Sequence, residues 1–95
     1  MSWTYTVKEL AKAIGVQSVP SDGFFHAVST DSRTLKAGSV FFALKGERFD
    51  GKEFVSQAFA KGATAAVTTE PNPDGLCLVV DDPLAALQQF AAYHR

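Results

Sequence analysis

The sequence predicts a small α/β domain in which a mixed β-sheet is flanked by helices. Along its 95 residues, short apolar runs typical of buried strands alternate with stretches that carry apolar residues at helical spacing. A connection that contains a helix joins parallel neighbouring strands most easily, so this alternation favours a sheet covered on its faces. The predicted order of elements is α, β, β, α, β, β, α, in one domain over residues 1–95.

The first predicted helix spans residues 7–14. Thr6 and Glu9 have capping-box spacing before it, and its apolar residues follow at i, i+3, i+4 and i+7. Gly15 is placed to end the helix in a left-handed conformation.

Two further helices are predicted in the second half of the chain. Residues 52–61 carry two adjacent i, i+4 apolar pairs on one face, and Gly62 follows where a C-terminal cap belongs. Asp82 is an acidic N-cap with Pro83 at the first helical position of the last helix. That helix reaches the last residue without a terminating glycine, asparagine or proline, which indicates a chain cut from a longer one.

Four strands are predicted from apolar or β-branched runs bounded by turn residues. They cover residues 24–28, 40–44, 63–68 and 76–80. The run at residues 40–44 shows no polar alternation, so both of its faces are expected to be covered, as in a strand inside an α/β sheet.

Composition excludes several classes of function. The 9 basic and 10 acidic residues are interspersed and give a net charge of -1, which leaves no broad footprint for nucleic acid or an anionic membrane. The only cysteine, Cys77, cannot form an intramolecular disulfide and is expected to be a small buried apolar residue. No secretory signal and no apolar run near the roughly 18 residues of a membrane span occurs, so a cytoplasmic location is expected.

Residues 45–51, after the second predicted strand, are a candidate anion-binding loop. Lys45, Arg48 and two glycines precede a predicted helix, so cations and backbone N–H groups could converge there on a phosphate. The alternative is a solvated loop in which Arg48 pairs with Glu47 or Asp50. The sequence contains no G-x-x-x-x-G-K-[ST] motif, so this loop is not a Walker motif.

Residues 29–33, after the first predicted strand, supply a second set of polar groups. Thr30 and Ser32 carry hydroxyls, Asp31 a carboxylate and Arg33 a guanidinium, which suit hydrogen bonds to a sugar or to the edge of a base. Alternatively, Asp31 and Arg33 pair with each other and order the loop.

No catalytic or metal-binding residue is predicted. His26 has no second histidine or cysteine at ligand spacing, and metal sites need several convergent ligands. A hydrolase that uses Asp31 and His26 is not supported, because no nucleophile, base and orienting group can be assembled.

A resemblance to a known protein family gives information that the spacing of single motifs does not. The run S-T-D-S-R-x-L-x-x-G-x-V-F-F-A-L-K-G-E-R-F-D-G-K-x-F, followed by A-x-x-x-G-A at residues 58–63, resembles the N-terminal domain of the Mur ligases. The segment A-L-K-G-E-R-F-D-G favours the ligases that add D-alanyl-D-alanine to UDP-N-acetylmuramoyl-tripeptide over the sister ligases that add the third peptide residue.

The resemblance implies a domain that holds the uridine diphosphate end of the UDP-N-acetylmuramoyl-peptide substrate. By matching position, the family's contacts to the UDP moiety fall on Thr30, Ser32, Glu47, Arg48 and Phe49. The neighbours expected to shape this site are Asp31, Arg33, Lys45, Gly46, Asp50 and Gly51. Relatives often have histidine where this chain has Lys52, and whether that charge faces the ligand stays open.

The resemblance also implies what lies outside this chain. In the family, a separate central domain binds ATP and magnesium, and a third domain brings the incoming amino acid or dipeptide, so the 95-residue chain is expected to hold no cofactor and to be inactive alone. Two alternatives remain: the sister ligase, or a module that docks on other domains or proteins and has no small-molecule ligand of its own.

Overall fold

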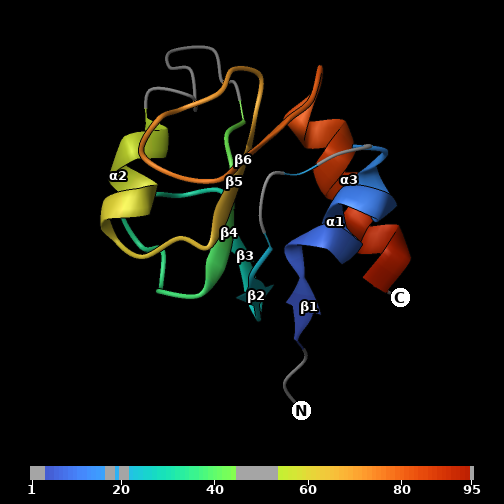
Figure 1. Cartoon of the computed structure of the whole chain (residues 1–95), viewed down its shortest axis with the longest axis horizontal. Coiled ribbons are helices and arrows are strands. Elements are labelled where there is room, and N and C mark those ends of the chain that lie inside the picture. The colour runs from blue at the N-terminus through green and yellow to red at the C-terminus, as the bar shows by residue number, and fades with distance from the viewer. Residues whose placement is uncertain (1–3, 17–18, 20–21, 45–53, 95) are drawn as a thin grey trace.

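The computed structural model describes residues 4–16, 19, 22–44 and 54–94, which form two β-sheets and three helices (Figure 1). In chain order the elements are β1 (Tyr5–Thr6), α1 (Val7–Ile14), β2 (Phe24–Phe25), β3 (Ala27–Ser29), β4 (Ser39–Phe42), α2 (Val55–Ala60), β5 (Ala65–Thr68), β6 (Cys77–Val79) and α3 (Pro83–His94).

The main sheet has four strands in the order β3-β4-β5-β6, and each neighbouring pair is parallel. Val40 in β4 lies opposite Val28 in β3 and Ala65 in β5, which fixes the register of the centre of the sheet. A separate antiparallel ribbon joins β1 to β2. The predicted α/β class is therefore confirmed, with the parallel and antiparallel pairings divided between two sheets.

Helices α1 and α3 lie on one side of the main sheet and α2 lies on the other (Figure 1). The hydrophobic core is divided accordingly into two clusters. The α1/α3 core contains Val7, Leu10, Ala11, Ile14, Phe25, Val40, Phe42, Ala65, Val67, Leu78, Ala86 and Phe90. The smaller α2 core contains Leu35, Phe41, Ala43, Val55, Ala58 and Ala66.

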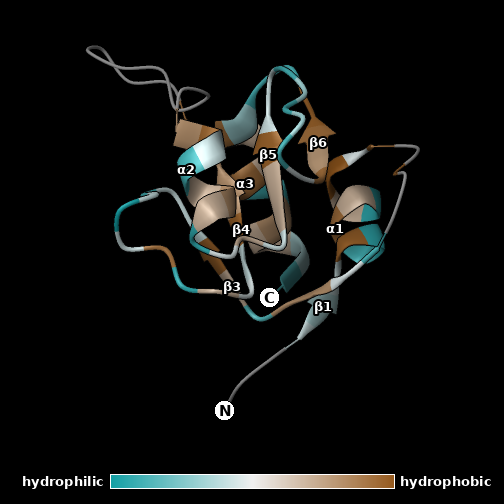
Figure 2. Cartoon of the chain, turned by 60° about the vertical axis from the view of Figure 1, so that its left-hand side comes forward, coloured by the Kyte–Doolittle hydropathy of each residue, from teal (hydrophilic) through white to brown (hydrophobic). Residues whose placement is uncertain are grey.

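Strand β4 supplies both cores because successive side chains of a strand point to opposite faces. Val40 and Phe42 belong to the α1/α3 core, and Phe41 belongs to the α2 core. All four residues of β4 are buried, which confirms that both faces of this strand are covered. Burying each such large side chain contributes about 1.5–3 kcal/mol. Figure 2 shows the result, since the strands of the main sheet are drawn largely in brown, hydrophobic shades.

Helix α1 begins and ends as the sequence predicts. The Thr6 hydroxyl accepts a hydrogen bond from the Glu9 N–H, and the Glu9 carboxylate accepts one from the Thr6 N–H, each at 3.1 Å. Asp22 adds a second cap by accepting the Lys8 N–H at 3.1 Å. Gly15 follows the helix with φ 81°, and its left-handed conformation ends the helix.

Helix α2 is shorter than predicted. Of the predicted residues 52–61, the helix covers Val55–Ala60 after a 3₁₀ residue at Phe54, and residues 52–53 lie outside the described part. Gly62 has φ 96° and donates to the Phe59 carbonyl at 3.0 Å, while the Ala63 N–H donates to the Ala58 carbonyl at 3.1 Å. These two bonds form a Schellman ending, as the glycine predicts.

Helix α3 starts at the predicted cap. The Asp82 carboxylate accepts hydrogen bonds from the N–H groups of Leu84, at 3.1 Å, and Ala85, at 3.3 Å. Near the other end of the helix, Phe90 packs edge-to-face on Tyr5 of β1, with ring centroids 5.5 Å apart. The helix is thus fixed to both the main sheet and the ribbon.

The prediction of one strand over residues 24–28 is wrong. The chain changes sheets at His26: Phe24 and Phe25 pair with β1, whereas residues 27–29 form β3 in the main sheet. The His26 N–H donates to the Gly38 carbonyl at 3.1 Å, which holds the chain at the change. Strand β1 was not predicted, because its two residues have no pattern of their own and are extended by pairing with β2.

Candidate functional site at the carboxyl edge of the main sheet

The carboxyl ends of all four parallel strands lie along one edge of the main sheet. Strands β3 to β6 end there at Ser29, Phe42, Thr68 and Val79. In open α/β sheets, ligands bind outside this edge. Strand β3, which precedes the first candidate loop, and strand β4, which precedes residues 45–51, both end at this edge. That the two loops belong to one site stays a prediction.

The first loop, residues 29–33, is ordered by its own side chains. The Ser29 hydroxyl donates to the Asp31 carbonyl at 3.0 Å and accepts from the Asp31 N–H at 3.1 Å. The Asp31 carboxylate then accepts from the Arg33 backbone N–H at 2.8 Å and from the Arg33 Nε at 3.2 Å. The predicted pairing of Asp31 with Arg33 is therefore confirmed.

This ion pair sets the charges of the loop. The hydrogen bond from the Arg33 side chain, followed by the bond from the Arg33 N–H, lowers the pKa of the Asp31 carboxyl, and the same contact raises the pKa of the Arg33 guanidinium. Both groups are therefore charged at neutral pH. The Arg33 side chain as a whole is 81% exposed, so the ion pair lies at the surface.

The two predicted hydroxyl ligands of the first loop differ in environment. Thr30 is exposed. Ser32 is only 4% exposed, and its hydroxyl donates to the Gln57 side-chain oxygen of α2 at 3.0 Å. The Thr30 hydroxyl is thus accessible to a ligand, whereas the Ser32 hydroxyl already donates a hydrogen bond to a side chain of α2.

The second loop lies outside the described residues. This applies to every residue assigned to it: Lys45, Gly46, Glu47, Arg48, Phe49, Asp50, Gly51 and Lys52. The chain is described up to Leu44, just after β4, and again from Phe54, just before α2. The sequence prediction for these residues stays a prediction.

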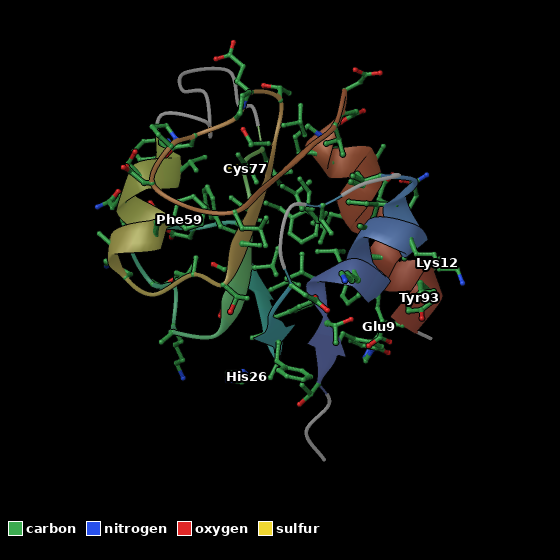
Figure 3. The ribbon with its side chains drawn as sticks, in the orientation of Figure 1. Glu9, Lys12, His26, Phe59, Cys77 and Tyr93 are labelled. Carbon is green, nitrogen blue, oxygen red and sulfur yellow. The ribbon has the colours of Figure 1, made fainter. Side chains whose placement is uncertain are left out.

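A third segment at the same edge was not predicted as part of a site. Residues 69–76 connect β5 to β6 and lie over α2, where Asn72 donates to the Ser56 hydroxyl at 3.0 Å. Gly75 lies so close to the ring of Phe59, a residue of α2 that is labelled in Figure 3, that an added Cβ at Gly75 would overlap the ring. The sequence shows these residues only as a cluster of turn formers, which gives no signal of what they contact.

Two residues with reactive side chains, His26 and Cys77, are not part of this site. His26 precedes β3, at the opposite edge, with its ring against Gly38. Cys77 is half-buried, and burial raises the pKa of its thiol although the Asn72 carbonyl opposes this. Over residues 4–16, 22–44 and 54–94, no three His, Cys, Asp or Glu side chains are grouped as a metal site requires. None of the helices in the described part is long and apolar enough to cross a bilayer.

Residues 24–95 match the family described as "Mur ligase family, catalytic domain". The chain is 43% identical over 93 residues to UDP-N-acetylmuramoyl-tripeptide--D-alanyl-D-alanine ligase of Bacillus subtilis, covering 90% of this chain and 20% of that protein. It is 40% identical over 90 residues to a UDP-N-acetylmuramoyl-L-alanyl-D-glutamate--2,6-diaminopimelate ligase of Prochlorococcus marinus, covering 85% of this chain and 18% of that protein.

Solved structures give the same picture. A crystal structure of MurF from Acinetobacter baumannii superposes with a TM-score of 0.82 and 35% identity over 97% of this chain and 21% of that one. MurF from Thermotoga maritima in complex with ADP superposes with a TM-score of 0.66 and 28% identity over 70% of this chain and 16% of that one. The chain thus spans about a fifth of the length of the relatives it matches.

Proposed function

The chain belongs to the Mur ligase family, with the fold of the MurF N-terminal domain, and we propose that it binds the uridine diphosphate end of UDP-N-acetylmuramoyl-tripeptide. The proposal assigns it to a ligase that adds D-alanyl-D-alanine, as the names of several relatives state for those proteins. The domain would supply affinity and orientation from a remote part of the substrate, while the reacting groups are held elsewhere.

The observation that carries the proposal is the ordered first loop at the carboxyl edge of the main sheet. Its internal hydrogen bonds and the Asp31–Arg33 ion pair hold this backbone in one shape before any ligand arrives. A preformed loop binds at lower entropic cost than one that must be ordered on binding. We propose that Thr30 and Ser32 hydrogen-bond the uridine end.

The second loop follows the neighbouring strand and would complete the site. We propose that Arg48 contacts the diphosphate, that Glu47 contributes a hydrogen bond and that Phe49 lies against a ring. A guanidinium suits this role because its charge-assisted hydrogen bonds to phosphate oxygens can be bidentate.

The chemistry of ligation would use other parts of the protein. ATP and magnesium would bind in a central domain beyond this N-terminal one, because the 95 residues contain no P-loop motif that would cradle phosphates. Although the family description names a catalytic domain, we assign no catalytic residue here. The cytoplasm is the location that we propose, since ATP is available there.

Nucleotide titration of the isotope-labelled chain, followed by amide NMR shifts, tests the proposal. We expect UDP to shift the amides of residues 29–33, whereas ADP at the same concentration does not. The affinity of these 95 residues for UDP is expected to be about millimolar, because they do not include the other domains that would complete the substrate cleft. No shift with UDP at several millimolar would favour the docking module instead.

Two variants separate the parts of the site. Arg48→Ala should weaken UDP binding by roughly 1.5–3 kcal/mol and leave uridine nearly unaffected, because only the diphosphate loses a charge-assisted bond. Ser32→Ala should weaken both ligands. Lys12→Ala is the matched charge control, since Lys12 points outward from α1 across the sheet from α2 (Figure 3).

A further inference from the structure

The connection between β3 and β4, residues 30–38, contains no helix. It packs against α2. Leu35, in the middle of the connection, is buried in the α2 core. At its far end, the Gly38 N–H donates to the Gly62 carbonyl at 3.1 Å, just after α2. Leu35 and Gly38 thus join the connection to α2 and to the residues just after it.

Two polar side chains of this helix region reach the first loop itself. The Gln57 side-chain oxygen accepts the Ser32 hydroxyl at 3.0 Å, and the Lys61 ammonium donates to the Arg33 carbonyl at 2.5 Å. Residues four apart on a helix lie on the same face, so Gln57 and Lys61 act side by side on consecutive residues of the loop. The charge of Lys61 also lowers the pKa of Asp31.

The opposite face of α2 fixes these two side chains relative to the sheet. Val55 and Ala58 are 1% and 0% exposed and pack in the α2 core against Phe41 and Ala66. The contacts within the first loop determine its shape, but they do not determine where the loop lies. Gln57 and Lys61 are the side chains that join residues 32 and 33 of the loop to α2 and the residue just after it.

We propose that Gln57 and Lys61 are positioning residues that hold the Ser32 hydroxyl and the backbone at Arg33 where the uridine end of the substrate binds, without contacting the ligand themselves. This inference rests on the proposed function. The two contacts are already present before binding, so the ligand does not have to order the loop and the entropic cost of binding is lower.

The experiment compares four single variants of the chain by UDP titration and by urea unfolding. Lys61→Met removes the ammonium but keeps most of the aliphatic stem, and Lys61→Arg restores a charged donor. Gln57→Ala removes the acceptor of the Ser32 hydroxyl. Lys12→Met, on α1, removes the same charge on the other side of the sheet.

We expect Lys61→Met and Gln57→Ala each to weaken UDP binding about three- to tenfold, the effect of losing one hydrogen bond that orders the loop. The Thr30 to Arg33 amide signals should shift or broaden without ligand. The urea midpoint should change little for Lys61→Met, because Lys61 is at the surface, and should fall for Gln57→Ala, because the buried Ser32 hydroxyl loses its acceptor. Lys61→Arg should recover most of the affinity, and Lys12→Met should behave as the unaltered chain.

The possible outcomes distinguish the positioning role of Gln57 and Lys61 from the proposed UDP binding. If the unaltered chain binds UDP and neither Lys61→Met nor Gln57→Ala changes affinity, the positioning role is wrong while the proposed function stands. Equal weakening by Lys61→Met and Lys12→Met would show that charge alone acts, which would also refute positioning by Lys61. If the unaltered chain fails to bind UDP, the proposed function fails, and the positioning role fails with it.

Discussion

Replacing Gly62 with alanine is expected to destabilise the fold more than the same change at Gly15, which also ends a helix in the described part of the chain. Gly62 has φ 96°, and alanine in the left-handed region costs roughly 1–2 kcal/mol. An added Cβ would also lie 2.9 Å from the Cβ and 3.2 Å from the Cα of Ala37, so backbone must move to make room. Overpacking of this kind costs about 1–3 kcal/mol.

The two contributions sum to roughly 2–5 kcal/mol of the free energy of unfolding. A domain of this length has roughly 5–14 kcal/mol in total, so the loss should be easy to measure by urea unfolding. Gly15→Ala is the matched control, because Gly15 also ends a helix with φ 81° but has nothing within 4 Å of an added Cβ. Gly15→Ala should therefore lose only the roughly 1–2 kcal/mol that alanine costs in the left-handed conformation.

The difference between the two variants therefore reports the contact with Ala37. Adding Ala37→Gly to Gly62→Ala should recover part of that difference, since one of the two crowded atoms is removed, and a double-mutant cycle measures the recovery. Equal destabilisation by Gly62→Ala and Gly15→Ala would refute the close packing of the β3–β4 connection on the end of α2.

Three further outcomes are expected. Asp82→Ala should lower the free energy of unfolding by about 1 kcal/mol in urea, the usual value of an N-cap, whereas Asp82→Asn should cost much less. By NMR, the Asp31 carboxyl should titrate below its ordinary pKa of 3.8, and Arg33→Gln should raise that pKa. The ion pair stabilises the fold above pH 4, and this stabilisation is lost as the pH falls through the lowered pKa of Asp31. Cys77 should react more slowly with iodoacetamide at pH 8 in the folded chain than in urea, because burial raises its pKa, and equal rates would contradict its placement.

Features set by neighbouring residues were predictable from the sequence. The Thr6–Glu9 capping box, the Asp82 cap and the glycine after α2 depend on contacts within a few residues, and all three are present. The pairing of Asp31 with Arg33 is equally local. The apolar run of β4 predicted a strand covered on both faces because no polar residue interrupts it.

Features set by distant residues were not predictable. The division of residues 24–28 at His26 depends on which strands are available as partners, and the residues themselves are compatible with one continuous strand. The contacts of Gln57 and Lys61 with the first loop join residues 25 and 28 positions apart, so no spacing rule reveals them. The roles of Glu47, Arg48 and Phe49 stay predictions from the family resemblance.

The unequal size of the two cores bears on how the domain opens. Among the residues that the structure describes, twelve buried ones hold α1 and α3 to the sheet, whereas six hold α2 and the β3–β4 connection. Local unfolding requires least free energy where the fewest apolar contacts are broken. In native-state hydrogen exchange, the amides of α2 should therefore exchange through a partial opening that leaves α1, α3 and their face of the sheet closed. The side that carries the first loop would be the less protected half of the domain, and a ligand bound there would slow exchange in α2 more than in α1.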